Sequence, residues 1–306
     1  YYESYDEIAP AHIFGRSIEG EGFRARQCFK EGVPDLSQYD TIFPKACAEE
    51  KENTLLHILS LRLRYPVSLT DEAKERYVAH LREQELYIMR QADMNYYPSM
   101  IEEQAIHEID SKIPVKAITA YVYEKFMDVV YEPEKREGIL FVGGFGHAPN
   151  LDAVQWFLDK IYPDVYKNIK ADFYIVGSKA PDEITHITTE GVIVKGFVSE
   201  EELQQLYNSC KLVVVPLRYG AGVKGKVVEA LYYGIPIVTT SVGAEGIKGI
   251  EDIAVVEDQE QKLIDAICKV YQNDEKLIEM SEKSQLYVRE KFSTDAVWDI
   301  VKEDFE

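Results

Sequence analysis

Short apolar runs alternate with amphipathic stretches throughout the C-terminal half of the sequence. The apolar runs, rich in β-branched residues, occupy 138–144, 172–177, 191–196, 211–216, 235–240 and 253–257. The amphipathic stretches occupy 151–162, 199–210, 226–233, 260–272 and 274–292, and a last helix begins at Ser293 or Thr294. Short buried strands separated by helices are typical of a parallel sheet with helical crossovers. The pattern therefore predicts a doubly wound α/β domain, in which Ser199 and Glu202 form a capping box.

The N-terminal half has weaker patterning. Residues 70–92 predict one long helix, and the segments 94–99 and 115–119 predict strands that flank a helix over 101–110. These elements indicate a second, smaller α/β unit. Three further expectations concern shorter stretches: a glycine turn that enters a helix over 15–26, a strand over 39–43, and a polar linker over 131–138.

Length and composition are consistent with two folded domains. At about 150 residues per domain, the 306 residues divide into an N-terminal domain over 1–133, a C-terminal domain over 134–290, and a closing helix over 291–306. Hydrophobic residues make up 46% of the chain and charged residues 29%, which is ordinary for a globular protein. The net charge of −20 disfavours binding to nucleic acid and strong attachment to anionic lipid.

The sequence also favours a cytoplasmic protein. No apolar run is long enough to cross a bilayer, and the first residues lack the basic and apolar regions of a secretory signal. The spacings of Cys28, Cys47, Cys210 and Cys268 fit neither a metal site nor a dense disulfide framework. We therefore expect reduced thiols and no transmembrane segment.

The most specific chemical signal lies in residues 216–247. Gly220, Gly222 and Gly225 follow a predicted buried strand and let the backbone approach a ligand closely. Lys224 and Lys226 lie in the turn that opens the next helix. Backbone N–H groups, the positive end of a helix and ammonium groups together favour an anion, most naturally a phosphate.

Glu229 follows Lys226 by three residues, nearly one helical turn. A carboxylate there can accept two hydrogen bonds from a vicinal diol such as a ribose, so the pair fits a nucleoside diphosphate. Two other motifs overlap with this stretch. Gly220–Gly225 matches the dinucleotide fingerprint G-x-G-x-x-G, but three predicted strands precede the one that leads into it, whereas the fingerprint belongs to a first βαβ unit. Gly220–Lys226 matches G-x-x-x-x-G-K, but Val227 stands where Mg²⁺ ligation requires Ser or Thr. The remaining alternative is a tight turn with solvated lysines.

Residues 195–247 resemble the donor-binding domain of the retaining glycosyltransferases of the group 1, or family-4, type, which have the GT-B fold. ILFVGGFGHAPNLDAVQWF resembles the family's first strand and glycine loop, ADFYIVGS its second βα unit, and REKFSTDAVWDIV its closing helices. The resemblance spans about residues 85–306 and is strongest over 138–306. It implies two Rossmann-like domains: a complete C-terminal doubly wound parallel sheet and a reduced N-terminal domain.

The resemblance implies roles for particular residues. Lys226, with Arg218 and Lys224, would neutralise the diphosphate of a sugar nucleotide, and Glu229 would hold the ribose hydroxyls. The remaining donor contacts would come from loops that follow strands: the backbone at Phe197 and Val198 for the base, Gly143, Gly144 and Gly146 for the phosphates, and Gly243, Ala244 and Glu245 near the sugar–phosphate end.

Two positions depart from the family pattern. The first glutamate of the family's glutamate pair falls on Ala221. His57 matches a family histidine but lacks the acidic neighbour, and a packed core position is the simpler interpretation. The catalytic residue is therefore left unassigned, with His57 the one candidate. The acceptor domain is either reduced, or segments of the natural protein are missing from the sequence.

These features predict a hexosyltransferase-like enzyme. It would move a sugar from a nucleotide-diphospho-sugar to an acceptor hydroxyl with retention, in the assembly of a polysaccharide, glycolipid or glycoprotein glycan. We expect no metal and no cofactor, because fixed cations and a helix N-terminus would stabilise the leaving diphosphate. The expected partners are the donor and a glycan, lipid-linked or protein acceptor. Two alternatives stay open: a non-catalytic sugar-nucleotide or carbohydrate binding module of a larger assembly, and an NAD(P)-dependent oxidoreductase.

Overall fold

A computed structural model describes residues 12–18, 22–29, 82–83, 85–220 and 222–305. The chain divides into two compact units. The first comprises Tyr1–Ala120 and Trp298–Glu306, and the second comprises Tyr121–Val297. This division rests on compactness alone, and the domain ranges expected from the sequence stay a prediction.

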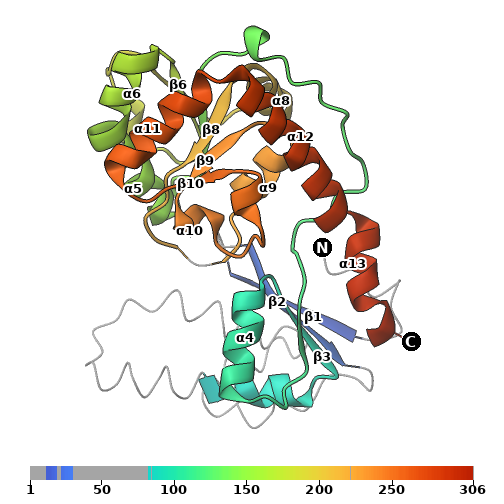
Figure 1. The fold of residues 1–306 in the computed structure, drawn as a ribbon. Helices are drawn as coiled ribbons and strands as arrows, with labels where there is room; N and C mark the ends of the chain where they lie inside the picture. Colours follow the sequence, from blue (N-terminus) through green and yellow to red (C-terminus); the bar gives the residue numbers. More distant parts are fainter. Residues whose placement is uncertain (1–11, 19–21, 30–81, 84, 221, 306) are drawn as a thin grey trace, which may run out of the picture. The chain divides into compact units, whose positions relative to one another are not determined.

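The second unit is built on a six-stranded parallel sheet (Figure 1). Its strands lie in the order β10-β9-β8-β5-β6-β7, and every pairing is parallel. The strands are β5 (Ile139–Val142), β6 (Phe173–Val176), β7 (Val192–Gly196), β8 (Leu212–Val215), β9 (Ile237–Thr239) and β10 (Val255–Val256). Each of them falls inside one of the predicted apolar runs, because strands covered on both faces need apolar side chains in both directions.

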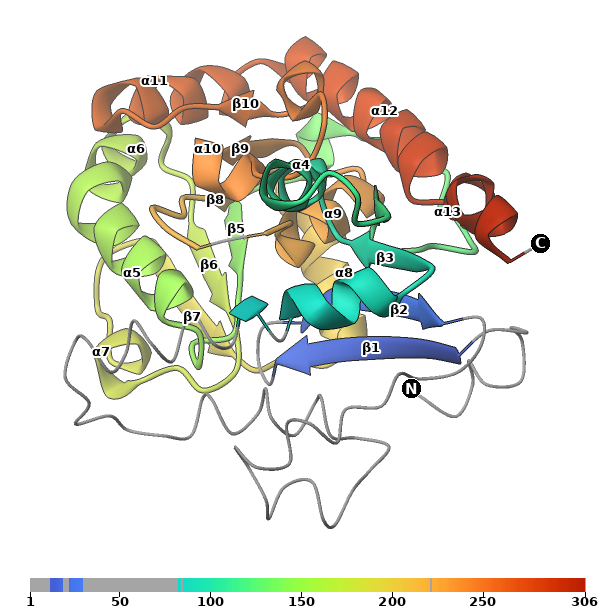
Figure 2. The same cartoon turned by 90° about the horizontal axis from the view of Figure 1, so that it is seen from below.

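Helices cover both faces of this sheet, with α5, α6 and α11 on one face and α9 and α12 on the other (Figures 1 and 2). The helices are α5 (Ala148–Trp156), α6 (Tyr162–Ile169), α7 (Asp182–Thr185), α8 (Glu200–Ser209), α9 (Gly225–Tyr232), α10 (Ser241–Ala244), α11 (Glu260–Tyr271), α12 (Asp274–Lys291) and α13 (Thr294–Val301). A π-helical turn, η3 (Phe157–Ile161), joins α5 to α6, and short 3₁₀ turns form η2 (Pro133–Lys135) and η4 (Ile250–Asp252). A further 3₁₀ turn, η5 (Lys302–Asp304), follows α13 and belongs to the first unit. The α/β class and the doubly wound sheet predicted from the pattern are confirmed.

The capping box at the start of α8 is half formed. The Ser199 hydroxyl accepts a hydrogen bond from the Glu202 backbone N–H at 3.2 Å, as predicted. The Glu202 carboxylate, however, pairs with the Lys195 ammonium at 3.2 Å.

The sheet has a topological switch point between β5 and β8. From β5 the chain proceeds outward through β6 to β7, and it then returns to lay β8 on the other side of β5. The loops after β5 and β8, residues 143–147 and 216–224, therefore leave the same edge of the sheet as neighbours. In doubly wound sheets this is the place where ligands bind.

The first unit contains a four-stranded sheet in the order β1-β2-β3-β4. The antiparallel strands β1 (His12–Ile18) and β2 (Gly22–Phe29) are followed by β3 (Met94–Tyr97) and β4 (Val115–Ala117), which are parallel and joined by α4 (Met100–Ile109). The strand–helix–strand unit predicted over 94–119 is confirmed. Residues 82–83 and 85–91 of the long predicted helix are helical. Its other residues, and the strand expected over 39–43, lie outside the described residues.

The helix expected to follow a glycine turn over 15–26 is wrong, because β1 and β2 occupy this stretch. Phe23 and Ala25 alternate with Arg24 and Arg26. A period of two is typical of a strand, and it outweighed the glycine signal.

The stretch 131–138 is packed into the second unit, although its polar composition predicted a linker. The hydroxyl of the buried Tyr131 donates to the Lys211 carbonyl at 2.5 Å. The guanidinium of Arg136 donates to the carbonyls of Tyr207 at 2.8 Å and Cys210 at 3.2 Å. Two anchoring side chains thus fix a segment whose other residues are mostly polar.

The last residues of the chain are anchored within the first unit. Val301 packs against Tyr96 of β3. The Lys116 ammonium of β4 bonds both carboxylate oxygens of Asp304, at 2.7 and 2.8 Å, and the Tyr96 hydroxyl donates to the same carboxylate at 2.7 Å.

Candidate functional site

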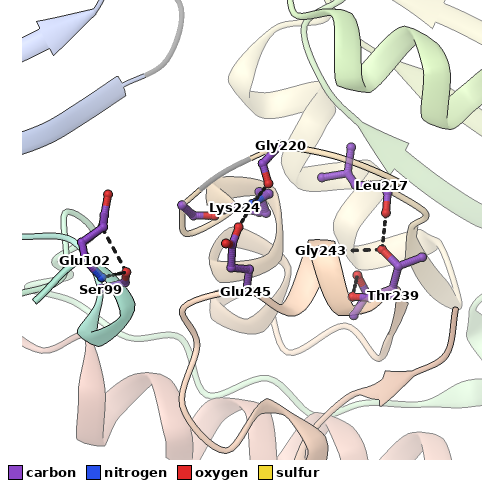
Figure 3. Close-up of polar contacts among 10 residues, drawn as sticks. Ser99, Glu102, Leu217, Gly220, Lys224, Thr239, Gly243 and Glu245 are labelled. Carbon is purple, nitrogen blue, oxygen red and sulfur yellow. Dashed lines mark hydrogen bonds and ion pairs between the residues drawn. The ribbon is translucent and has the colours of Figure 1, made fainter. Parts of the chain in front are cut away.

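The 216–224 loop carries the glycines and the first lysine of the predicted anion site. Gly220 and Gly222 have φ angles of 126° and 81°, which a residue with a side chain rarely adopts. The Lys224 ammonium folds back on this loop and donates to the carbonyls of Gly220, at 3.1 Å, and Gly222 (Figure 3). It also pairs with Glu245 at 3.0 Å. Because an ammonium has three N–H donors, Lys224 uses all of them inside the loop and its flank.

Lys226, in the first turn of α9, crosses to the neighbouring loop after β5. Its ammonium donates to Oδ1 of Asn150 and lies 4.6 Å from the centre of the Phe141 ring. Gly143 leaves room for it, since a Cβ there would lie 2.6 Å from Nζ. Burial, together with the charge of Lys224, lowers the pKa of Lys226 to about 7. Within the described part of the chain, no carboxylate pairs with this ammonium.

Asn150 is a site residue that the sequence interpretation missed. It is the third residue of α5 and is 9% exposed. Its Nδ2 donates to the Gly144 carbonyl at 2.7 Å, while its Oδ1 accepts from Lys226. The available signal was Asn directly after Pro149, since a proline in the first turn marks the helix start beside the glycine loop.

Arg218, which the resemblance placed at the diphosphate, is held by a residue of α5. Its guanidinium bonds both carboxylate oxygens of Asp152, with 2.9 Å between Nε and Oδ2, and lies 5.5 Å from the centre of the Trp156 ring. The Asp152 hydrogen bond raises the pKa of Arg218. The side chain stays exposed, so its charge is already paired at the surface.

Glu229 lies on α9 among tyrosines. The hydroxyl of the fully buried Tyr207 donates to Oε2 of Glu229 at 3.0 Å, and the Tyr207 ring stacks on Tyr233 with 4.5 Å between centres. Burial raises the pKa of Glu229, and the Tyr207 hydrogen bond opposes that rise. Burial raises the pKa values of Tyr121 and Tyr123, and the Glu229 charge raises them further. The sequence offered no spacing that would have assigned these tyrosines to one carboxylate.

The base-side candidates follow β7. Phe197 is 82% exposed, while Val198 packs against the core. The preceding Gly196 has a φ of 66°. An exposed aromatic ring thus stands at the same edge of the sheet as the two glycine loops.

Gly243 has a packing role. It lies in α10, where a Cβ would come within 2.0 Å of the Thr239 Oγ1 and 2.9 Å of the Val215 carbonyl. Its N–H donates to the Thr240 hydroxyl at 3.2 Å, which caps α10 and in turn donates to Leu217 at 2.5 Å (Figure 3). The glycine therefore allows α10 to lie directly on the ends of β8 and β9.

The other candidates at this edge are less constrained. A Cβ at Gly144 would meet the Ser178 hydroxyl at 3.5 Å, an ordinary contact, and one at Gly146 would lie 3.3 Å from Lys179. Ala244 is buried at 7% exposure.

The structure does not describe every residue that the sequence analysis singled out. His57 and Ala221 lie outside the described residues, as does Cys47. Cys210 and Cys268 are free thiols. Among the described residues, no group of three or more His, Cys, Asp or Glu side chains is arranged to hold a metal ion, and no helix has the length and apolarity to cross a membrane.

Residues 136–273 match the family model described as "Glycosyl transferases group 1". The match covers less than half of the chain, and we call the matched segment, 136–273, the group 1 domain. The group 1 domain includes Asn150, Lys226 and Glu229, and it spans all six strands of the second unit. The resemblance to group 1 glycosyl transferases and the GT-B fold are confirmed. Retention and the reduction of the N-terminal domain stay predictions.

Other proteins are similar to part of this chain, in sequence or in fold. An uncharacterized 44.6 kDa protein in the cps region of Klebsiella pneumoniae is 31% identical over 116 residues, which covers 35% of this chain and 30% of that protein. TarM of S. aureus superposes with a TM-score of 0.60 at 18% identity, over 73% of this chain and 46% of that chain. Sucrose-phosphate synthase of Thermosynechococcus elongatus superposes with a TM-score of 0.60 at 16% identity, over 88% of this chain and 77% of that chain. The matches thus span under a third of the Klebsiella protein and under half of TarM.

Proposed function

We propose that the protein transfers a glycosyl group from a nucleoside-diphosphate sugar to an acceptor hydroxyl, with retention at the anomeric carbon, in glycan biosynthesis. The observation that carries the proposal is Lys226, a half-buried cation in the first turn of α9, at the switch point between β5 and β8. Its surroundings in the described part of the chain supply no anion, and a diphosphate would.

Three similarities support this proposal. The group 1 domain includes the residues around Lys226. A TarM variant was solved with fondaparinux, alpha-GlcNAc-glycerol and UDP, and the Klebsiella relative is described as a protein of the cps region. We therefore propose a uridine diphosphate sugar as the first donor to test, and a carbohydrate polymer or its precursor as the acceptor class.

The proposed reaction breaks the bond between the anomeric carbon and the diphosphate oxygen. A new bond forms to the acceptor oxygen on the same face of the sugar, and the acceptor proton leaves with the diphosphate. Negative charge develops on the leaving group, where Lys226 and the N–H groups of the first turn of α9 stabilise it. One such fixed donor contributes on the order of 3 kcal/mol to transition-state stabilisation.

The other donor contacts follow from the same placement. Glu229 accepts hydrogen bonds from the ribose hydroxyls, with Tyr207 holding its Oε2. Phe197 offers an exposed ring and its backbone at the edge where the base would lie. We propose that no metal is needed, because α9 and Lys226 supply the positive charge. Turnover that persists in excess EDTA would support this part.

The first test is thermal stability of the whole chain with UDP, GDP, ADP and their sugars, since a ligand that binds only the native state raises the melting temperature. We expect one nucleoside diphosphate to raise it in the wild type and in Lys262→Ala, which changes an exposed lysine of α11, but not in Lys226→Ala. No shift with any of them would overturn the proposal.

Transfer assays with the same sugars then separate catalysis from binding. Turnover is expected. Binding without turnover would favour a non-catalytic sugar-nucleotide module, the second candidate.

A further inference from the structure

The side chain of Asn150 joins the two loops of the switch point. Its Nδ2 donates to the Gly144 carbonyl of the loop after β5, at 2.7 Å, and its Oδ1 accepts from the ammonium of Lys226 on α9. A carbonyl can only accept and an ammonium can only donate. Both neighbours therefore require the same orientation of the amide, which leaves the side chain one arrangement.

The space around this contact leaves Lys226 little freedom. The Phe141 ring lies on one side of the ammonium at 4.6 Å, and the Gly143 Cα lies on another, where even a Cβ would be 2.6 Å away. Asn150 itself is 9% exposed. The amide is thus the polar contact that fixes the direction of the ammonium at the end of β5.

A neutral amide has a particular consequence here. Among the described residues, the charge that acts on Lys226 is that of Lys224, which is itself matched by Glu245, while Asn150 and Phe141 are neutral. A carboxylate at position 150 would have the same shape but would neutralise the ammonium. The amide directs the cation without cancelling its charge.

We propose that Asn150 is a positioning residue that aims the Lys226 ammonium at the switch point while leaving its charge for the diphosphate of the donor. This inference rests on the proposed function. Asn150 acts through Lys226, so its loss is expected to change binding and its pH dependence more than the fold.

The test compares Asn150→Asp with Asn168→Asp in the whole chain. Asn168 is an exposed residue of α6 whose amide donates to the Asp164 carbonyl at 2.7 Å, so its change adds the same charge elsewhere. We expect Asn150→Asp to weaken UDP binding at pH 7.5 at least tenfold by calorimetry, and Asn168→Asp to change it less than twofold. The UDP affinity of Asn150→Ala is expected to fall between those of the wild type and Asn150→Asp. Alanine no longer directs the Lys226 ammonium, but it adds no opposing charge.

A second readout needs no nucleotide. Amine-reactive labelling followed by peptide mass spectrometry measures the titration of Lys226 in the unliganded protein. The carboxylate of Asn150→Asp should favour the charged amine and reduce its labelling at pH 7.5 about tenfold, with no change in Asn168→Asp. Equal labelling and equal UDP affinity in Asn150→Asp and the wild type would overturn the inference. A wild type that binds no nucleotide would refute the proposed function, and the labelling result would still decide the role of Asn150.

Discussion

Replacing Lys226 by methionine is expected to stabilise the unliganded protein at neutral pH, at the cost of nucleotide binding. Methionine has nearly the same length and keeps the contact with Phe141. The pKa of Lys226 is lowered to about 7, mainly by burial. Between that value and the ordinary value of 10.5, the unfolded chain holds a proton that the native state lacks. This lysine therefore destabilises the fold most below pH 7, and the destabilisation disappears as the pH rises towards 10.5.

The magnitude follows from about 1.4 kcal/mol for each pKa unit. The full shift corresponds to about 4 kcal/mol at pH 7 and about 1.5 kcal/mol at pH 9.5. Partial solvent contact reduces the first figure to about 2–4 kcal/mol. Methionine leaves the Asn150 Oδ1 without its donor, which costs about 1–2 kcal/mol. The net expectation is a gain of up to about 3 kcal/mol at pH 7 and a change close to zero at pH 9.5.

Urea unfolding followed by tryptophan fluorescence measures this difference. The chain has two tryptophans, and Trp156 lies in the second unit, so a Trp298→Phe background reports the unit that holds Lys226. Lys262→Met, a change at an exposed lysine, is the matched control and should stay within about 0.5 kcal/mol at both pH values. A stability change for Lys226→Met that is the same at pH 7 and pH 9.5 would refute the reasoning, because only the titration of the buried amine makes it vary.

Three further predictions concern the same edge of the sheet. Gly143→Ala should weaken UDP binding at least tenfold by calorimetry, because its Cβ meets Lys226 Nζ at 2.6 Å. Lys262→Ala, at an exposed lysine of α11, should change it little, and equal effects would contradict the geometry. Gly243→Ala should destabilise the second unit by about 2 kcal/mol or more in urea unfolding, since its Cβ falls 2.0 Å from Thr239 Oγ1, and an unchanged midpoint would count against it. Tyr207→Phe should raise the donor KM about 10–150-fold, as loss of one hydrogen bond to a charged group implies. It should also move the acid limb of the donor-affinity profile to higher pH, because the pKa of Glu229 is already raised and loses an opposing hydrogen bond; an unmoved limb would exclude this role for Tyr207.

The sheet of the second unit could be predicted from the sequence because its signal is local. Residues 212–215, for example, are apolar without interruption. A strand with apolar side chains in both directions is typical of a sheet covered on both faces. The hairpin over 12–29 was missed, because two local signals conflict there. Its alternation is short, and the glycines at 20 and 22 suggested a different turn.

The partners of the site residues could not be predicted, because they come from distant parts of the chain. Asn150 lies 76 residues before Lys226, and Tyr207 lies 22 residues before Glu229. Sequence spacing places Lys226 and Glu229 on one helix, which α9 confirms. It does not show which side chain of the neighbouring loop or helix meets each of them. That depends on the strand order, which sets β8 beside β5.

The two lysines of the turn show how much such partners decide. In the sequence, Lys224 and Lys226 are equivalent candidates for a phosphate. In the structure, Lys224 satisfies its three donors with two carbonyls and the Glu245 carboxylate. An anion that recruited it would have to break an ion pair and leave a carboxylate beside a phosphate. Lys226 meets a neutral amide and an aromatic ring, so an anion gains a counter-charge there and breaks no ion pair. We therefore propose that Lys226, rather than Lys224, binds the phosphate, and that Lys224 holds the loop closed.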